Sequence, residues 1–246
     1  MALTAQQLAD LMPDATQLES NEPEMESSLH YAQLALLVAC LEWLWRDRND
    51  FFIGANLTIY FSREQLKNRD FRGPDFFLVN QTKRKPRRSW VVWEEGGQYP
   101  DLIIELLSPA TEKTDRSLKK ALYQDRFRTP EYFWFSPDTL EFEGYRLVSQ
   151  HYEAIAANAA NQRWSEVLGL FLGVQGDRLR YFYPSGEIVP TPEEVAAAAQ
   201  LKAEQAQIAL QQLQTRAQQT EERAASMAAQ LQALGIDPEL PANDPE

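Results

Sequence analysis

Two carboxylates inside an apolar run are the residues of this chain best suited to do chemistry. Asp101 and Glu105 lie four residues apart within residues 99–109, which read YPDLIIELLSP. The apolar run predicts a buried strand, and because side chains alternate along a strand, both acids project from the same face. Buried strands rarely carry acids unless the acids are paired or bind a metal. Asp101 and Glu105 are therefore candidates for a carboxylate cluster.

A third acid precedes another apolar strand upstream. Asp75 lies in residues 73–79, which read GPDFFLV, and the two predicted strands are expected to be neighbours. Mg²⁺ and Mn²⁺ are hard ions, and Mg²⁺ binds one or two carboxylates together with phosphate oxygens. Such an ion can activate water for phosphodiester cleavage, and a nearby lysine would stabilise the charge on the phosphate. Asp75 and Asp101 each follow a proline, so a turn or cap role stays open for both.

The order of the predicted elements gives a fold that can bring these residues together. An amphipathic helix over about residues 27–46, with Ser27 or Ser28 as its cap, is followed by several strands. A second helix opens at Thr114 or Asp115 and offers Lys113, Lys119 and Lys120. The expected strands are 51–61 with a bend at 54–56, 75–80, 101–107, 131–136, 140–147, 151–155 and 180–183, and residues 89–94 form either another strand or an ordered loop. This order predicts an α/β fold with a central mixed sheet flanked by helices.

The charge distribution gives two interpretations of one basic run. The net charge of -12 argues against nonspecific binding to nucleic acid. A dense basic run nevertheless lies between the acid-bearing segments, and it holds Lys83, Arg84, Lys85, Arg87 and Arg88. The run either flanks the mouth of the site and holds a phosphate backbone of DNA, or forms a solvated loop that offsets acidic surroundings.

The C-terminal part has a different pattern. From Ala196 to Leu234, small and apolar residues alternate at spacings of three and four, and Gly235 ends the pattern. This predicts a long helix over 191–236 that either forms a coiled coil in a homo-oligomer or remains a lone solvated helix. Residues 1–26 are expected to be a polar lead-in, 27–190 the main domain and 237–246 a disordered tail.

The remaining composition fits a cytoplasmic protein that does not bind membranes. No apolar run reaches the roughly 18 to 20 residues that cross a bilayer. The N-terminal residues lack the pattern of a signal peptide. The single cysteine, Cys40, lies in the first helical pattern and is expected to be core filler in a reducing compartment.

Together the motifs resemble the Uma family, whose members are described as restriction endonucleases of the PD-(D/E)xK nuclease-like superfamily. The residues that carry the resemblance are Pro100-Asp101, Glu105, Ser108-Pro109, Thr111, Asp115-Arg116, Lys119, Leu122-Tyr123 and 129–134, with Gly73-Pro74-Asp75 and the helix of His30 upstream. The resemblance implies a restriction-endonuclease-like core with Asp75 and Glu105 as metal ligands. The superfamily places a lysine two residues after the second acid, where this chain has Leu107, so the resemblance points to Lys119 instead.

The implied activity is Mg²⁺- or Mn²⁺-dependent endonuclease cleavage of DNA, and three questions stay open. Asp101 is either a third ligand or a strand-start residue. The chain is either a nuclease or a non-cleaving module that assembles through its tail, because Leu107 departs from the superfamily pattern. A weaker alternative is a hydrolase of small phosphate-containing substrates. Glu26 and His30 are expected to have a capping and a structural role, respectively.

Overall fold

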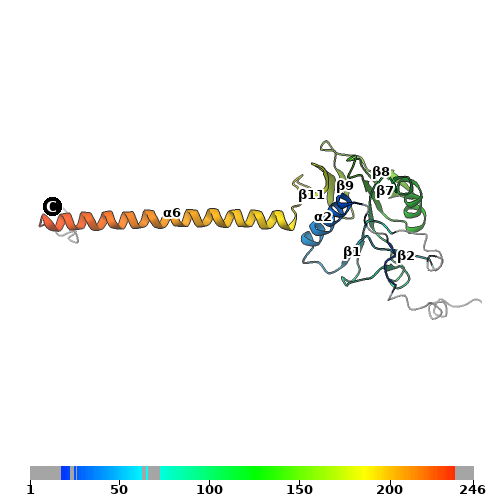
Figure 1. Ribbon diagram of the computed structural model, residues 1–246, viewed down its shortest axis with the longest axis horizontal. Helices are drawn as coiled ribbons and strands as arrows, with labels where there is room; N and C mark the ends of the chain where they lie inside the picture. The colour runs from blue at the N-terminus through cyan, green and yellow to red at the C-terminus, as the bar shows by residue number, and fades with distance from the viewer. Residues whose placement is uncertain (1–17, 23–24, 26, 63–64, 66–72, 236–246) are drawn as a thin grey trace, which may run out of the picture. The chain divides into compact units, whose positions relative to one another are not determined.

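A six-stranded mixed sheet forms the centre of the fold. The structure, a computed structural model, describes residues 18–22, 25, 27–62, 65 and 73–235. The strand order is β1-β3-β5-β6-β7-β8, with β5 and β6 parallel and all other neighbours antiparallel. Figure 1 labels β1, β7 and β8 of this sheet. The strands are Phe51–Ala55 (β1), Phe76–Asn80 (β3), Leu102–Leu106 (β5), Glu131–Phe135 (β6), Phe142–Val148 (β7) and His151–Ala154 (β8). The predicted α/β class with a central mixed sheet is confirmed.

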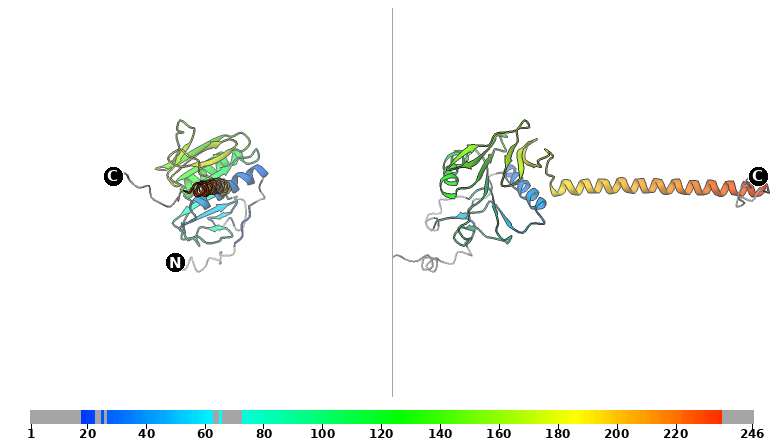
Figure 2. Two further views of the ribbon diagram at one scale, coloured as in Figure 1. Left: turned by 90° about the vertical axis from the view of Figure 1, so that its left-hand side faces the viewer. Right: turned by 180° about the vertical axis from the view of Figure 1, so that it is seen from behind.

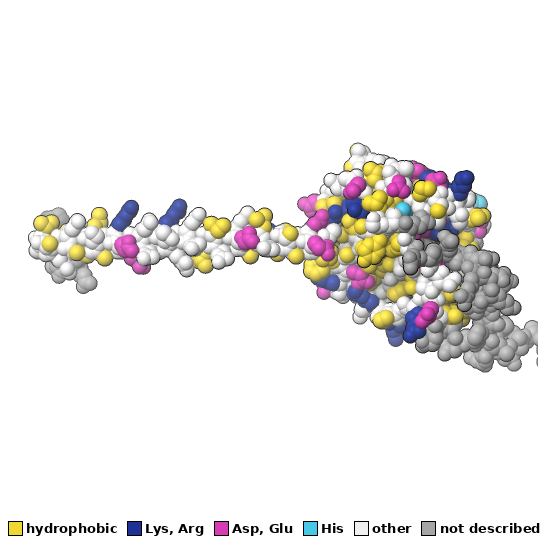
Figure 3. Space-filling view, in the orientation of Figure 1, with side chains coloured by type: hydrophobic (Ala, Val, Ile, Leu, Met, Phe, Trp, Pro, Cys, Tyr) yellow, Lys and Arg dark blue, Asp and Glu magenta, His cyan; other side chains and the backbone are white. Residues whose placement is uncertain are grey.

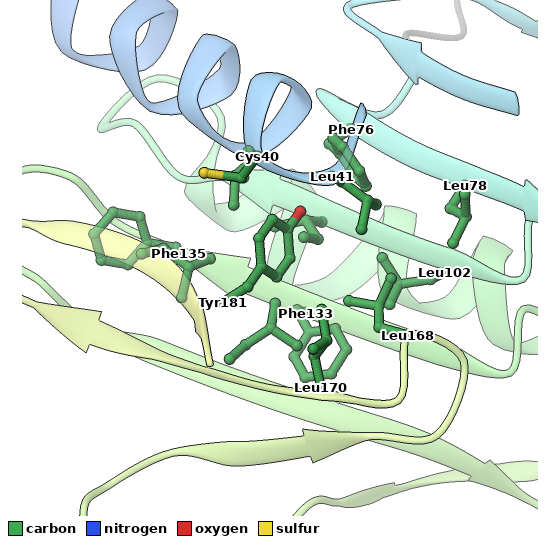
Figure 4. Packing of buried hydrophobic residues seen from close by; sticks show 14 of the residues in the cluster. Cys40, Leu41, Phe76, Leu78, Leu102, Phe133, Phe135, Leu168, Leu170 and Tyr181 are labelled. Atoms are coloured by element: carbon green, nitrogen blue, oxygen red, sulfur yellow. The ribbon is translucent and has the colours of Figure 1, made fainter. Parts of the chain in front are cut away.

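One face of the sheet is covered by the first helix and a second, smaller sheet. Helix α2 (Ser28–Leu44) begins where the Ser27 side chain accepts a hydrogen bond from the backbone N–H of His30, which fits the predicted cap. The smaller sheet has the antiparallel order β11-β10-β9, formed by Arg178–Phe182 (β11), Leu170–Gln175 (β10) and Arg163–Ser165 (β9). Figure 4 shows Cys40 and Leu41 of α2 packed with Tyr181 of β11 and with the central strands.

The opposite face is covered by the second helix and a two-stranded parallel pair. The helical run consists of α4 (Glu112–Thr114), the π-helical turn η1 (Asp115–Lys119), α5 (Lys120–Leu122) and a second π-helical turn η2 (Tyr123–Phe127). The parallel pair joins β2 (Ile59–Tyr60) to β4 (Trp90–Val91). The second hydrophobic cluster, which includes Phe77, Ile103 and Tyr132, forms between these elements and the sheet. Figure 2 shows these layers from two further directions.

The second helix begins earlier than predicted because of the turn at Ser108. The backbone oxygen of Ser108 accepts a hydrogen bond from the backbone N–H of Glu112 at 2.9 Å, and its side-chain oxygen accepts from Ala110 and Thr111 at 3.2 Å each. These bonds satisfy backbone donors at the helix start that would otherwise be unpaired. The helix therefore opens at Glu112 rather than at Thr114 or Asp115.

Alternation along β5 divides its side chains between the two faces. Leu102, Ile104 and Leu106 belong to the α2 side, whereas Ile103 belongs to the side of the second helix. Glu105 shares the parity of Ile103, so it points to the side where the lysine-bearing helix lies.

The C-terminal helix belongs to a separate unit. The chain divides into two compact units, Met1–Pro192 and Glu193–Glu246, a boundary two residues from the predicted one. Helix α6 (Pro192–Ala233) is a single helix of 42 residues. Across the described helices, none combines the length and the apolar character required to cross a membrane. The predicted capping residue Glu26, the disordered tail at 237–246 and most of the lead-in lie outside the described residues.

Candidate active site

The antiparallel register of β3 and β5 sets Asp75 opposite Glu105. Phe76 pairs with Ile104, so the next step along both strands brings the two acids together. The backbone N–H of Leu106 donates a hydrogen bond to Asp75 Oδ2 at 2.7 Å, and the backbone N–H of Asp75 donates to Glu105 Oε2 at 3.4 Å. Each carboxylate is thus held by the backbone of the strand that carries the other.

A close approach of the backbone explains the glycine that precedes this pair. A Cβ atom added at Gly73 would lie 2.3 Å from the backbone oxygen of Leu57. The backbone N–H of Gly73 also donates a hydrogen bond to the Glu22 side chain. A side chain at position 73 would push this segment away, and Asp75 with it.

Lys119 enters the same site from the second helix. Its Nζ donates to Glu105 Oε2 at 3.1 Å, lies 3.0 Å from Asp115 Oδ1 and approaches the backbone oxygen of Gly73 at 3.4 Å. The strand position expected to carry a lysine is filled by Leu107, which packs in the core. The structure therefore brings together Asp75, Glu105 and Lys119, the three residues predicted for catalysis.

Asp115 and Tyr123 complete the polar cluster, and neither was predicted to have a role in the site. The Tyr123 hydroxyl donates to Glu105 Oε1 at 2.7 Å, and Asp115 is buried beside Lys119. Asp115, Lys119 and Tyr123 follow one another at intervals of four, and a run that mixes α- and π-turns has about four residues per turn. The three side chains therefore line one side of the run, and this spacing was the available signal.

Burial and charge together set the protonation of the cluster. Burial raises the pKa of the Asp75 carboxyl and raises that of Glu105 well above its usual range, although the Lys119 ammonium opposes both effects. Burial alone would lower the pKa of Lys119, but the nearby carboxylates of Glu105, Asp115 and Asp75 outweigh it, so its pKa is raised. Lys119 therefore carries its charge at neutral pH.

The donor set of this cluster fits a hard divalent cation. With all groups ionised, Asp75, Glu105 and Asp115 carry three negative charges and Lys119 carries one positive charge. The two negative charges that remain equal the charge that a divalent ion neutralises. Mg²⁺ favours such oxygen donors and commonly takes two carboxylates and completes its shell with water and phosphate oxygens. Among the described residues, no three Asp, Glu, His or Cys side chains are arranged to hold a metal ion together. Asp75 and Glu105 are two carboxylate donors that the backbones of neighbouring strands hold close together.

Asp101 lies at the other end of β5. Four residues separate it from Glu105, which corresponds to about 13 Å along a strand. Its Oδ2 accepts a hydrogen bond from the backbone N–H of Asn80 at 2.7 Å, and burial raises the pKa of its carboxyl group. This position does not allow Asp101 to share an ion with Glu105, and its contacts fit the strand-start alternative.

The basic run pairs with acids outside the cluster. Its first part lies at the Asn80 end of β3, where the backbone N–H of Arg84 donates to the backbone oxygen of Asn49 at 3.1 Å. The Arg87 guanidinium donates to both oxygens of Glu95, at 2.6 and 2.9 Å. The other ion pairs of the run are Arg84 with Glu42, Lys85 with Glu95 and Arg88 with Glu19; within the described chain, Lys83 forms none.

The residues of the basic run differ in their burial and in their contacts. Arg87 has a side chain only 4% exposed and lies over the rings of Phe52 and Trp90, so it has no surface to offer a phosphate. Lys83, Arg84, Lys85 and Arg88 are exposed. For Arg84 and Arg87 the contacts fit the interpretation that the run offsets nearby acids.

With this geometry in place, comparison with known proteins identifies the family. The Uma2 family model, described as "Putative restriction endonuclease", matches residues 17–179. The chain belongs to the Uma2 family. The matched range contains both acid-bearing strands and the helix of Lys119, so the resemblance predicted from the motifs is confirmed.

A solved structure is also similar to this Uma2 chain. It is the crystal structure of a protein from Anabaena variabilis described as a putative nuclease belonging to DUF820. The two share 15% sequence identity with a TM-score of 0.43, over 68% of this chain and 91% of the other. No match was found among curated proteins.

His30 of the Uma2 chain links α2 to the end of β5. Its Nδ1 lies 2.8 Å from Ser27 Oγ and its Nε2 lies 3.2 Å from the backbone oxygen of Leu107. The ring is buried and both nitrogens have partners, which fits the structural role that was expected. Cys40 is buried in the core, also as expected.

Proposed function

We propose that this chain is a metal-dependent endonuclease that hydrolyses DNA phosphodiester bonds. The observation that carries the proposal is the meeting of Asp75, Glu105 and Lys119 in one buried cluster, although they come from two strands and a helix. Membership of the Uma2 family supports a nuclease-like function for such a cluster.

Each side chain has a role in this proposal. Asp75 and Glu105 would hold Mg²⁺ or Mn²⁺, which would supply activation of water and neutralisation of phosphate charge. Lys119 remains an ammonium because its pKa is raised, and it stabilises the negative charge that develops on the phosphate. Tyr123 orients the Glu105 carboxylate through its 2.7 Å hydrogen bond.

The test is cleavage by the purified full-length chain. Supercoiled plasmid and short DNA duplexes are incubated with the protein in Mg²⁺ or Mn²⁺, beside the variants Asp75→Asn and Glu105→Gln. Cleavage is expected to require the metal and to fall by about 100-fold or more in each variant, the scale of a lost electrostatic stabiliser. Equal product from wild type and variants would show a contaminating nuclease and contradict the proposal.

Asp101→Asn is a matched control because it changes an acid on the same strand. The substitution lies away from the cluster, since residue 101 is about 13 Å from Glu105 along β5. The asparagine side chain retains an oxygen that can accept the hydrogen bond from the Asn80 backbone. Cleavage is expected to survive this substitution, and a loss as large as that of Glu105→Gln would remove the assignment of the site. A parallel assay with RNA duplexes distinguishes cleavage of DNA from cleavage of RNA.

A non-cleaving assembly module is the second candidate function. The observation that favours it is the row of exposed apolar side chains on α6, which includes Leu210 and Leu213. A chain that binds Mg²⁺ through Asp75 and Glu105 but leaves every DNA and RNA substrate intact would support this candidate over the nuclease.

A further inference from the structure

Helix α6 carries a seam of small and apolar side chains that has no partner within the helix itself. Within α6 no residue is buried, and Leu210, Leu213 and Met227 are 56%, 62% and 68% exposed. Positions three and four residues apart form one stripe along a helix, and such a stripe is stabilised when it packs against a second helix. In heptad notation the seam has Ala196, Ala203, Leu210, Ala217, Ala224 and Leu231 at a, and Ala199, Ala206, Leu213, Thr220, Met227 and Leu234 at d.

The charges beside this seam follow the same register. The three basic residues of α6 are Lys202, Arg216 and Arg223, and all of them fall at position g. Glu221 falls at position e, on the other flank of the seam. No ion pair joins any of these four residues to another described residue, and none has an opposite charge three or four positions away on the same flank. Figure 3 shows apolar side chains along the length of α6 and basic side chains on one edge.

We propose that α6 pairs with α6 of a second copy of this chain as a parallel, in-register, two-stranded coiled coil. In that arrangement position g of one helix faces the following position e of the other, so Arg216 lies against Glu221 of the partner subunit. Two-fold symmetry forms this pair twice. An antiparallel pair would instead set the basic g row against the basic g row, which like charges oppose.

The dimer is tested with the full chain at micromolar concentrations by analytical ultracentrifugation. The wild type is expected to sediment with the mass of a dimer. Leu213→Glu introduces a charge at the seam and is expected to give the monomer mass. Ile208→Glu is the matched control, because Ile208 is 57% exposed but lies at position f, opposite the seam. A monomeric wild type, or equal effects of the two substitutions, would overturn the proposal.

The orientation is tested by cysteine cross-linking. In a parallel, in-register pair each d residue faces its own copy, so Thr220→Cys is expected to form an intermolecular disulfide under oxidation. Thr215→Cys at position f is expected to stay monomeric on a non-reducing gel. A dimer in which Thr220→Cys fails to cross-link, or cross-links no more than Thr215→Cys, would overturn the parallel register.

A charge exchange tests the pair itself. Arg216→Glu alone and Glu221→Arg alone set like charges against each other and are expected to weaken dimerisation several-fold. Both substitutions in one chain recreate opposite charges across the interface and are expected to restore it. A double variant that does not regain dimerisation would contradict the pairing of Arg216 with Glu221 of the partner subunit. These outcomes do not depend on whether the chain cleaves DNA.

Discussion

A tyrosine and a lysine of the second helix both contact the Glu105 carboxylate, so residues from another element influence its charge state. The Tyr123 hydroxyl donates to Oε1 at 2.7 Å, and the Lys119 ammonium lies 3.1 Å from both Oε1 and Oε2. Both contacts favour the ionised form, and burial opposes it. A cation would bind the ionised carboxylate, so under the proposed function these helix residues influence the pH at which Glu105 can act as a metal ligand.

Tyr123→Phe isolates the tyrosine contribution. Loss of the 2.7 Å hydrogen bond is expected to raise the pKa of Glu105 further and to destabilise the fold by about 1–2 kcal/mol. The stabilisation of the protein by Mg²⁺, measured as a thermal shift across pH, is expected to set in at higher pH than in wild type. An unchanged pH profile would show that the hydroxyl only fills space.

The pH dependence of stability tests the raised pKa of Glu105. A group whose pKa is higher in the folded state contributes stability below its ordinary pKa, which is 4.5 for this residue, and loses that contribution as pH rises through the folded value. Glu105→Gln removes the titrating carboxyl group and with it this loss of stability. The free energy of unfolding of the variant minus that of wild type is therefore expected to increase with pH. The slope is at most about 1.4 kcal/mol per pH unit for one proton.

Denaturant titrations of both proteins at a series of pH values measure this difference. Lys119 does not disturb the comparison, since its pKa is raised above 10.5 and it remains charged over the acidic and neutral range. A difference that is constant with pH would contradict a raised pKa for Glu105.

At the scale of the elements, the buried side chain of Arg87 holds the loop between β3 and β4 against Glu95, Phe52 and Trp90. Arg87→Ala breaks the ion pair with Glu95 and uncovers the rings of Phe52 and Trp90. The free energy of unfolding is therefore expected to fall by about 3 kcal/mol. Arg88→Ala is the control at the adjacent position, because the Arg88 side chain is 60% exposed and its pair with Glu19 lies at the surface. Its effect on the unfolding free energy is expected to stay within about 0.5 kcal/mol.

The sequence predicts β3 and β5 but misses two strands of the smaller sheet. An apolar run with Glu105 as its one charged residue predicts β5, whereas Gly173 interrupts β10 and obscures its pattern. Gly173 is not a break, because a Cβ atom there would lie 2.7 Å from the Gln162 side chain, so the glycine permits a close approach. The short β9 has too few residues for its alternation to be recognised.

The acids of the site were predictable from the residues themselves, whereas their partners on the second helix were not. Asp75 and Glu105 stand out because carboxylates are unusual beside buried strands. Lys119 required the resemblance to the Uma family, and the contact of Tyr123 depends on π-turns that the sequence pattern did not predict. The charge pattern also could not show that Glu95 would pair with Arg87, since an ion pair depends on how the loop folds.

At the scale of the whole molecule, the two units are expected to be separable. Deleting residues 193–246 removes α6, which has no buried residue, so the first unit is expected to keep its thermal unfolding temperature. A shorter chain that ends before Val189 is the control, because Val189 is buried in the core and its loss exposes that region. A lower unfolding temperature after the first deletion would show that α6 stabilises the first unit.

The alternation of side chains along β5 also limits which insertions and deletions this strand can tolerate. Each strand residue faces one of two hydrophobic clusters, and the cluster beneath the second helix lies beside a cation, Lys119, that pairs with Glu105. Loss of a single codon between Leu102 and Glu105 would exchange the two sets of side chains, burying the acid beneath α2 and turning hydrocarbon toward the lysine. Length changes of one residue are therefore excluded from β5, whereas the exposed part of the loop after Gln81 can lengthen without altering this parity.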